Sequence, residues 1–557
     1  MTIHGHDRAE PSVPVKGSFL PRRGRYRMQT PRFPSLPRWT RRALLVLPLV
    51  LAVSLQACTD LEENPTSSIT PDNFYQSEAE VLGGLASVYA VLRNTIWGYY
   101  NLAEITSDEM IVPTRGSDWF DNGRWLELHR QGWTATSASA LDDINAAWSD
   151  AFAGVTRANV LLTALEDLTI ADKEAVIAEV RTLRAFYYYQ LMDLFGGVPI
   201  VTDISIEPRE AASRDSVFRF IESELLAARD DLPALWPAGD HGRMTQGAAN
   251  AILASMYLNA GVFTTSTPNA VAYNSCAGIQ VTGGQDACDA AIAAADAVLA
   301  DYALAPEGEW QSNFEADNYQ STENVLVIKF LNESGLGLNL IMRALHYNQF
   351  NPSPWNGFAA LAETYLAFDP DDERRDVFLE GQQVCQNPGG CGSVDYGDPV
   401  NDRSDAPLIF TVDIADPTAA TEAEGTRIMK YPPDPDHVAE QNGNDFAYFR
   451  AGEMVLIKAE AELAKGNAGS ALTLVNQLRA RVFEPDQPLG AVDTDGILAE
   501  RLFELAGEAK RRTDLIRHGK YTQAWFAKNA TEPHKVLMPI PQPQIDANPL
   551  LQQNPGY

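Results

Sequence analysis

The chain has 557 residues, of which 45% are hydrophobic and 21% are charged, with 43 Lys and Arg against 74 Asp and Glu. This apolar share is enough for a large buried core and excludes a wholly disordered chain. The formal net charge of −31 argues against a nucleic-acid-binding protein, which needs Lys and Arg to neutralise phosphates.

The first 57 residues differ from the rest of the chain and have the features of a signal peptide. They carry ten Lys and Arg against two Asp and Glu, whereas residues 58–557 carry 33 against 72, a net charge of −39. An arginine cluster at residues 38–42 precedes an apolar run, residues 43–53. As a helix this run would span about 16 Å, half of a bilayer core, which favours a signal peptide over a membrane span. Met28 is an alternative start that would leave a conventional basic leader.

Residues 55–58, Leu-Gln-Ala-Cys, resemble a bacterial lipobox. The implied chemistry is cleavage before Cys58 and acylation of its thiol and of the new α-amine. Several acyl chains anchor a protein stably to a membrane. We therefore expect residues 1–57 to be removed, residues 58–75 to form a lipidated tether, and residues 76–557 to form a single domain. A buried cysteine that happens to follow an apolar run is the alternative interpretation.

The four remaining cysteines fall into two local pairs, Cys276 with Cys288 and Cys385 with Cys391, each in a stretch rich in Gly and Asn. An oxidising compartment favours two short-loop disulfides. Metal binding is the alternative. It is disfavoured because neither pair has zinc-ribbon spacing and no His lies close in sequence.

Apolar residues at helical spacing predict a mainly α-helical chain. The predicted helices cover residues 81–92, 144–165, 173–195, 216–229, 245–259, 286–300, 446–465, 468–482 and 496–517. Gly466-Asn467 joins two of these helices into a hairpin. Ala-rich facing sides favour tetratricopeptide-type helix pairs, in which small residues allow close approach, although no regular 34-residue repeat is visible.

Between the predicted helices lie long segments with little regular pattern, which we interpret as loop insertions at residues 95–141, 261–355 and 383–445. The strongest strand prediction is residues 324–330. Ordered proteins that retain irregular loops this long generally use them for function. We therefore expect a ligand site in these loops.

Several segments follow one another in an order that resembles the SusD/RagB family of outer-membrane nutrient-binding lipoproteins. They are the lipobox and residues 60–65, 181–199, 242–249, 450–461, 500–517 and 539–557. The resemblance implies a scaffold of tetratricopeptide-like helix pairs, with irregular loops and a few short strands building the ligand face. It also implies a lipid-anchored protein at the outer-membrane surface that captures oligosaccharides or polysaccharides for a SusC-like TonB-dependent transporter, without catalysis.

Sugar binding requires flat aromatic rings for pyranose C–H faces and polar side chains for the hydroxyls. Loop 95–141 is rich in both, a second aromatic cluster surrounds residues 355–358, and Trp310 with Tyr319 forms a third. In the family, the stacking aromatics come from the loop after the first helix and from a later mid-chain loop. The glycan-binding residues that the resemblance implies are Trp97, Tyr100, Trp119 and Trp355. Each ring could instead pack its loop onto the core.

Charged residues within the matching helices predict partly buried salt bridges rather than catalysis. These residues are Arg181 and Arg184 with Glu179, and Glu500, Arg501, Glu504 and Arg511. No hydrolase, phosphate-loop or dinucleotide motif is present. The acidic run at residues 369–376 lacks the EF-hand pattern. We therefore expect no cofactor and no metal.

Two other functions stay open from the sequence: a surface glycoside hydrolase, and a helical-repeat scaffold that binds peptide or protein. Many carboxylate pairs arise by chance among 72 acidic residues. A search for a glycosidase pair therefore does not distinguish an enzyme from a binding protein. The strong negative charge disfavours acidic polysaccharides and favours a neutral glycan.

Overall fold

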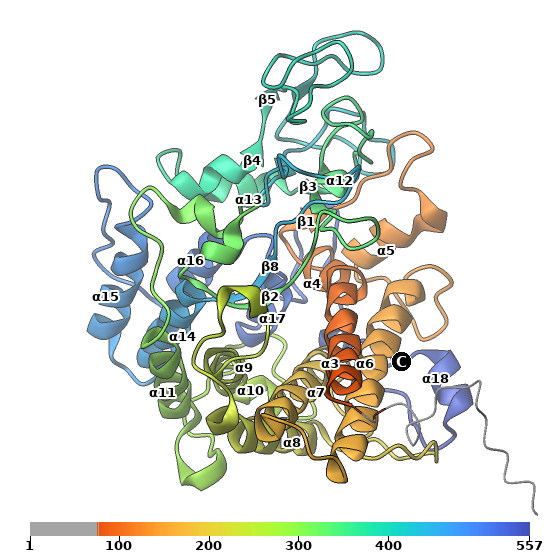
Figure 1. The fold of residues 1–557 in the computed structure, drawn as a ribbon. Helices are drawn as coiled ribbons and strands as arrows, with labels where there is room; N and C mark the ends of the chain where they lie inside the picture. The colour runs from red at the N-terminus through yellow and green to blue at the C-terminus, as the bar shows by residue number, and fades with distance from the viewer. Residues whose placement is uncertain (1–74, 76) are drawn as a thin grey trace, which may run out of the picture. The chain divides into compact units, whose positions relative to one another are not determined.

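The computed structural model describes Tyr75 and residues 77–557 and is mainly helical (Figure 1). The predicted signal peptide, Cys58 and nearly all of the tether lie outside the described residues. The α-helices are α3 (Glu78–Ala90), α4 (Gly98–Glu104), α5 (Arg124–His129), α6 (Leu141–Glu166), α7 (Lys173–Phe195), α8 (Arg214–Ala228), α9 (Gln246–Leu258), α10 (Ala260–Phe263), α11 (Ala287–Leu299), α12 (Leu340–Ala344), α13 (Ala362–Ala367), α14 (Ala451–Ala464), α15 (Ala468–Arg479), α16 (Thr494–Leu505), α17 (Arg511–Arg517) and α18 (Gln542–Ala547). None of these helices combines the length and the apolar character that a membrane span requires.

Four two-stranded antiparallel sheets join segments that are far apart in the sequence. They are β1 (Met110–Ile111) with β3 (Ala359–Ala360), β2 (Asn324–Ile328) with β8 (Phe446–Arg450), β4 (Phe378–Leu379) with β7 (Arg427–Ile428), and β5 (Gly381–Gln382) with β6 (Ile409–Phe410). The first of these sheets ties the segment after α4 to the mid-chain loop, which brings together the two regions in which a ligand site is expected.

The long helices pack as neighbours, α6 on α7, α7 on α8, and α9, α11, α14 and α15 in succession. Small residues make the close approaches possible. A Cβ on Gly154 of α6 would lie 2.4 Å from the ring of Tyr187 on α7, so only glycine fits there. Ser213, Thr245 and other N-cap side chains accept a backbone N–H from the first turn, which satisfies a donor that the helix itself leaves unpaired.

Two of the predicted helices are wrong in part. Residues 446–450 form strand β8, because their aromatic run pairs with β2 instead of continuing the helix that starts at Ala451. The predicted helix 496–517 is two helices, α16 and α17. Gly507 and Ala509 between them have φ angles of 77° and 60°, and residues in that left-handed conformation end a helix.

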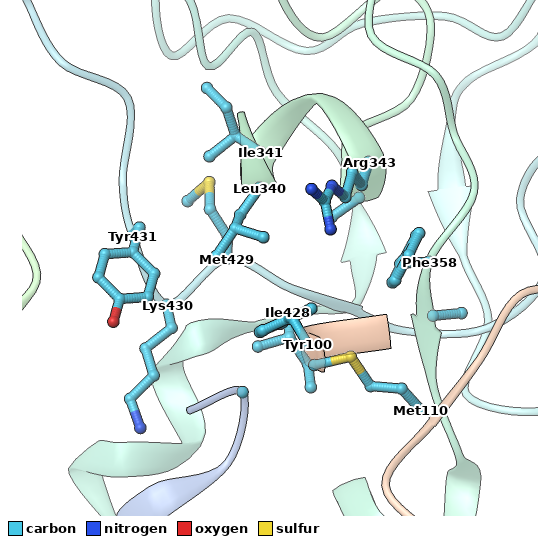
Figure 2. Close-up of a pocket in the computed structure, with 13 residues that line it drawn as sticks. Tyr100, Met110, Leu340, Ile341, Arg343, Phe358, Ile428, Met429, Lys430 and Tyr431 are labelled. Atoms are coloured by element: carbon cyan, nitrogen blue, oxygen red, sulfur yellow. The ribbon is translucent and has the colours of Figure 1, made fainter. Parts of the chain in front are cut away.

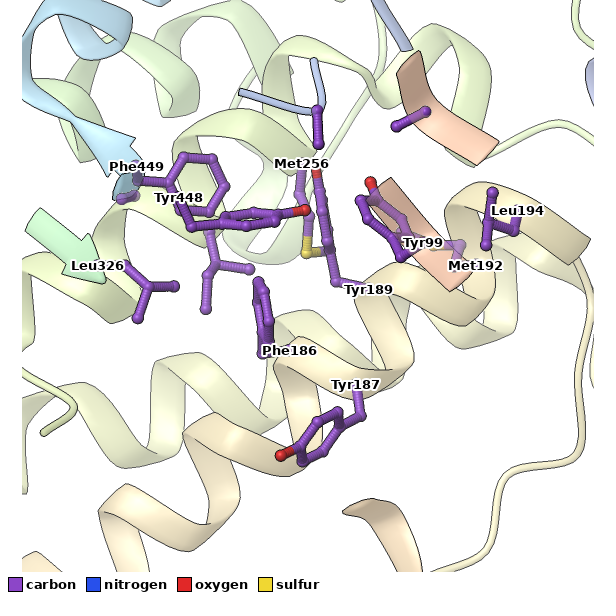
Figure 3. Close-up of a cluster of buried hydrophobic side chains, with 14 of the residues drawn as sticks. Tyr99, Phe186, Tyr187, Tyr189, Met192, Leu194, Met256, Leu326, Tyr448 and Phe449 are labelled. Atoms are coloured by element: carbon purple, nitrogen blue, oxygen red, sulfur yellow. The ribbon is translucent and has the colours of Figure 1, made fainter. Parts of the chain in front are cut away.

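The apolar core centres on the aromatic run of α7 (Figure 3). The ring of Phe186 packs edge-on against Tyr448 of β8, with centroids 4.8 Å apart. Tyr99 of α4 reaches the same cluster, 6.3 Å from Tyr448, and its hydroxyl donates to Asp193 at 3.2 Å. Helix α4 is therefore anchored in the core of the scaffold.

A second part of the core is ionic. Arg450 contacts Glu323 at 2.5 Å and Glu504 at 3.0 Å, and Arg481 contacts Glu504 at 2.5 Å. Arg374 also reaches Glu504, at 3.2 Å. All five side chains are at most 5% exposed. The prediction that Glu504 forms a salt bridge is therefore confirmed. The partners expected from helical spacing are wrong, since Arg501 binds Glu453 and Asp514 and Arg511 binds Asp108.

The predicted partner of Arg181 and Arg184 is wrong. Both arginines bind Glu224 of α8, at 2.8 and 2.5 Å, because their side of α7 faces that helix. Glu179 instead pairs with Arg243, at 2.5 Å.

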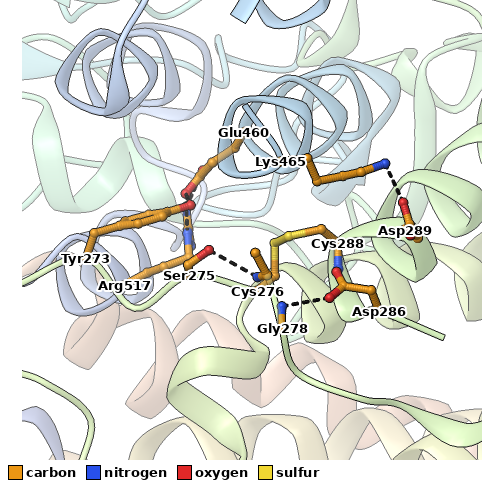
Figure 4. The surroundings of a disulfide bond; sticks show 11 residues. Tyr273, Ser275, Cys276, Gly278, Asp286, Cys288, Asp289, Glu460, Lys465 and Arg517 are labelled. Atoms are coloured by element: carbon orange, nitrogen blue, oxygen red, sulfur yellow. Dashed lines mark hydrogen bonds and ion pairs between the residues drawn. A yellow bond between two sulfur atoms is a disulfide. The ribbon is translucent and has the colours of Figure 1, made fainter. Parts of the chain in front are cut away.

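Both expected cysteine pairs are disulfides in the structure, Cys276–Cys288 and Cys385–Cys391. The first ties the loop after α10 to the start of α11 (Figure 4). There Asp286 caps the helix by accepting the N–H of Cys288 at 3.0 Å, and it also accepts the N–H of Gly278 at 2.7 Å. The second disulfide lies in the segment 378–428, which carries β4 to β7.

Candidate functional site

Two of the four aromatic residues expected at the site form an open pair. Trp97 lies between the 3₁₀ helix η1 (Val91–Ile96) and α4, and its side chain is 44% exposed. Its ring faces that of Trp355 at a centroid distance of 6.5 Å and an interplanar angle of 26°. Gly98 makes this position possible, because a Cβ there would lie 2.7 Å from the backbone of Ala147 on α6.

Trp119 supports this pair from the side. Its indole N–H donates to the backbone carbonyl of Trp355 at 2.6 Å. Its ring lies directly on Gly357, where a Cβ would come within 2.3 Å, and packs edge-on against Phe358. The backbone of Trp119 has a φ of 61°, a conformation that non-glycine residues seldom adopt. Trp119 is partly buried at the same face, and its hydrogen bond holds the backbone of Trp355 in position.

Tyr100 points inward. Its side chain is 4% exposed, and its ring packs edge-on against Phe446 at 5.9 Å. It lines a cavity of about 30 Å³ together with Arg343 and Phe358 (Figure 2). That volume has room for one or two water molecules but not for a sugar ring. Tyr100 therefore forms part of the floor beneath the tryptophans and presents no open ring face.

Arg343 of α12 is a site residue that sequence reasoning missed. Its guanidinium lies 4.0 Å from the ring centroid of Trp97 and is also near the rings of Tyr100 and Phe358. The residue is 2% exposed and forms no ion pair with any carboxylate in the described part of the chain. Burial lowers its pKa to about 10, so it stays charged at neutral pH. The only signal in the sequence is a lone cation within the apolar residues 340–344.

The side chain of Arg343 is held in place by two amide oxygens, those of Asn101 and Asn339, each 3.3 Å away. These partners are neutral. The charge of Asp143 acts on the guanidinium, but this carboxylate binds Asn101 and is paired with Arg124. A cation at this distance attracts the negative face of an indole ring. Trp97 is therefore held by the cation while 44% of its surface remains exposed.

A polar group of residues lies beside the tryptophans. Tyr347 donates to Asp118 at 2.5 Å, and Arg403 stacks over the ring of Tyr347 at 4.0 Å. Arg403 also pairs with Glu422 at 2.5 Å, and His346 contacts the same carboxylate at 3.0 Å. Burial and the bond to Asp118 raise the pKa of Tyr347 to about 12. The cluster presents the side chains of Arg403 and Asp118, both partly exposed, as partners for hydroxyl groups.

The third aromatic cluster of the sequence does not form a site with the others. Trp310 is 1% exposed and its indole N–H donates to Glu504 at 3.0 Å, so it belongs to the ionic core. Tyr319 is 52% exposed and its ring lies near His241. Phe120, next to Trp119, is 55% exposed and adds an aromatic ring that the sequence prediction did not select.

Among Tyr75 and residues 77–557, no three His, Cys, Asp or Glu side chains are arranged to hold a metal ion. In the acidic run 369–376, Asp372 caps a short helix and binds Arg374 at 2.7 Å. Its carboxylate therefore serves a structural contact.

Comparisons with known proteins agree with this architecture. Residues 61–258 match a family model described as starch-binding and associating with the outer membrane, and residues 414–532 match the model of the SusD family. The chain is 25% identical to the SusD-like protein P25 of Formosa agariphila, over 92% of this chain and 99% of that protein. It is also 25% identical to the starch-binding protein SusD of Bacteroides thetaiotaomicron, over 82% and 85% of the two chains.

Solved structures share the fold. A laminarin-binding SusD-like protein superposes with a TM-score of 0.66 at 24% identity, over 87% of this chain and all of that one. The surface glycan-binding protein A of Bacteroides thetaiotaomicron, in complex with laminarihexaose, has a TM-score of 0.65 at 20% identity, over 86% and 99% of the two chains.

Proposed function

The chain belongs to the SusD family, and on that premise we propose that it is a surface-exposed, lipid-anchored outer-membrane protein that binds an oligosaccharide or polysaccharide. It delivers this glycan to a SusC-like TonB-dependent transporter and catalyses no reaction on it. Cys58 carries the lipid anchor.

The observation that carries this proposal is the open pair of Trp97 and Trp355 above the buried cation of Arg343. Two indole rings inclined by 26° give successive sugar units flat surfaces on which to stack. Asp118, which precedes Trp119 in the chain, and Arg403 lie 3.8 Å apart and supply polar partners for sugar hydroxyls. Two relatives are described as binding laminarin or laminarihexaose, which makes a neutral β-glucan the first probe.

The carboxylates beside the tryptophans are poorly suited to hydrolysis. Glycosidases need one carboxylic acid that is protonated at working pH. Burial alone would raise the pKa of Glu422, but the hydrogen bonds from His346 and Arg403 outweigh it and lower that pKa. Asp118 accepts the Tyr347 hydroxyl. Neither carboxylate is placed as a proton donor, which supports binding without catalysis.

The test is calorimetric titration with laminarin and a panel of neutral and acidic glycans. We expect Trp97→Ala and Trp355→Ala each to weaken binding at least tenfold, because stacking area is lost without disturbing the core. Tyr396→Ala is the matched control, since Tyr396 is 62% exposed and lies in the segment 378–428. Unchanged affinity in both tryptophan variants would overturn the site, and release of shorter glycans would establish an enzyme instead.

A second surface favours a protein partner. A groove of about 480 Å³ is lined by α3, by residues 240–243 and by the end of β2. Leu82 and Leu331 in it are 44% and 37% exposed. Arg93 and Lys329 line the same groove and form no ion pair with a described carboxylate. We propose that an acidic segment of the transporter with an aliphatic side chain binds here.

The groove is tested by co-purification with the transporter after charge reversal. Lys329→Glu should weaken the complex, more at low than at high salt, since exposed charges are screened. Arg130→Glu, which reverses an exposed charge elsewhere, is the control. Equal yields for both variants would exclude the groove as the contact.

A further inference from the structure

Two buried glutamates lie beneath the candidate site, where α4 and β1 meet the helical scaffold. Glu104 is the last residue of α4, and Glu109 directly precedes β1; they are 0% and 1% exposed. Both bind the turn between α16 and α17. Glu109 Oε1 accepts the N–H of Gly507 at 2.5 Å, and Glu104 Oε1 accepts the N–H of Ala509.

The second oxygen of Glu104 has no donor. Glu104 Oε2 is buried and receives no hydrogen bond from any other donor in the described part of the chain. Glu109 lies close by, since the two carboxyl groups bind backbone N–H groups only two residues apart, at Gly507 and Ala509, and each shifts the pKa of the other. A buried carboxylate oxygen without a donor is costly, and two carboxylates at one site repel each other. One proton shared by the pair removes both penalties.

The neighbouring cations do not replace this proton. Lys430 donates to the carbonyl oxygens of Glu504 and Ala506 and to the carboxylate of Glu508. Arg511 is paired with Asp108 at 2.6 Å. Arg511 therefore has a carboxylate partner, and Lys430 shares that of Glu508 with Arg450. Neither cation donates a hydrogen bond to Glu104 or Glu109.

The other titratable groups around the pair are neutral. Burial raises the pKa of Tyr100, which faces Glu104, and that of Tyr431 well above the usual range. His129 contacts the carbonyl oxygens of Ile105 and Met110, and burial lowers its pKa. The acids at the pair that can change charge near neutral pH are therefore the two glutamates, and the basic group beside them is Lys430, whose pKa is lowered by burial.

We propose that Glu104 and Glu109 form a buried proton-binding site, which holds one proton at neutral pH and couples its occupancy to the helix that carries the aromatic pair. Helix α4 begins one residue after Trp97 and ends at Glu104. Loss of the proton places two negative charges between the end of this helix and the turn that it binds. The coupling to ligand binding rests on the proposed function, whereas the proton site does not.

The pH range follows from the direction of the shift. Burial raises the pKa of Glu109 to about 7 and that of Glu104 further above its usual value. A carboxyl group whose pKa is raised by folding stabilises the protein fully below its unfolded pKa of about 4, and that contribution is lost as the pH rises through the folded value. Stability should therefore fall between about pH 5 and pH 8.

The first experiment measures urea unfolding of the protein from pH 5 to pH 8.5. For one proton, the folding equilibrium constant of the parent should fall by up to tenfold per pH unit in this range. Glu109→Gln, which keeps the shape of a protonated carboxyl, should flatten the profile, and Glu104→Gln is the second variant. Glu363→Gln, at an exposed carboxylate, is the control and should retain the parent slope.

Infrared spectroscopy gives an independent readout. The parent at pH 6 should show the carbonyl stretch of a protonated carboxylic acid, and this band should be absent when Glu104 and Glu109 are both replaced by glutamine. The same pH slope in parent and both glutamine variants, or no such band in the parent, would overturn the proton site.

The coupling has its own test. The affinity for laminarin, or for the glycan that the panel identifies, should fall with rising pH in the parent and not in Glu109→Gln. Equal pH dependence in both would overturn the coupling alone. If no glycan binds at any pH, the proposed function and the coupling fail together, while the unfolding and infrared results still decide the proton site.

Discussion

Buried arginines have opposite surroundings in two regions: the helical scaffold, and the face that carries Trp97 and Trp355, here called the aromatic face. Arg450 in the scaffold is fully buried among Glu323, Glu504 and Glu508, and these carboxylates outweigh burial and raise its pKa well above the usual value. Arg343 at the face is equally buried, yet its partners are two amide oxygens and three aromatic rings, and its pKa is lowered. In the scaffold, charge fixes how helices pack. At the face, a charge without a carboxylate in contact holds the partly exposed ring of Trp97.

The largest effect is expected from breaking the scaffold network. Glu504→Gln preserves shape but removes the negative charge shared by Arg374, Arg450 and Arg481. Removing one partner of a buried ion pair costs about 3–5 kcal/mol, so the free energy of unfolding in urea should drop by that amount. Asp230→Asn, at a carboxylate that is 86% exposed, should leave unfolding unchanged. A similar urea midpoint of unfolding for both variants would show that the ionic network does not stabilise the scaffold.

The two disulfides extend the same comparison, since one lies in the scaffold and one in the segment 378–428. Cys276 and Cys288 are 12 residues apart, and Cys385 and Cys391 are six apart. Chain entropy predicts losses of about 3 and about 2 kcal/mol when each pair is replaced by serine. Urea unfolding gives the totals, and hydrogen exchange should show faster opening of α11 for the first pair and of residues 378–428 for the second. Equal exchange at both places in the two variants would show that the segments are not independent.

The smallest effect on stability, but a clear one on binding, is expected at Arg343. Arg343→Met keeps most of the volume and removes a buried cation that has no carboxylate, so the free energy of unfolding should change by less than about 1 kcal/mol. Glycan affinity should fall three- to tenfold, in line with a cation–π contribution of about 1 kcal/mol. Arg343→Lys should retain part of that affinity. If Arg343→Met instead lost much stability and kept its glycan affinity, Arg343 would serve packing, as Arg450 does, and the proposed difference between the two regions would be wrong.

Most of the helices could be predicted from the sequence, because their apolar residues repeat with the helical period and their ends carry Gly, Ser, Thr or Asp. The errors occurred where a distant segment decided the local structure. Strand β8 exists because β2 lies beside it, and α16 ends early at the turn that Glu104 and Glu109 bind. Neither contact leaves a periodic signal in the sequence around residues 446–450 or 506–510.

The candidate site was predictable only in part for the same reason. Trp97, Trp119 and Trp355 follow from aromatic loops and from the family resemblance, and their role in binding stays a prediction. The inward direction of Tyr100 depends on Phe446, which is far away in the sequence. The role of Arg343 depends on the approach of α12 to α4. Such pairings are set by tertiary packing, which single-sequence patterns do not encode.

The separation of Trp97 and Trp355 along the chain has a consequence for how the molecule matures. Contacts between distant segments pay a large loop-closure entropy and tend to form late in folding. A chain that has formed its helices but has not paired β1 with β3 lacks the stacked indoles. The stacked pair therefore forms only when folding is complete. Under the proposed function, such an intermediate would have a folded scaffold and no glycan site, so binding would distinguish fully folded molecules from this intermediate.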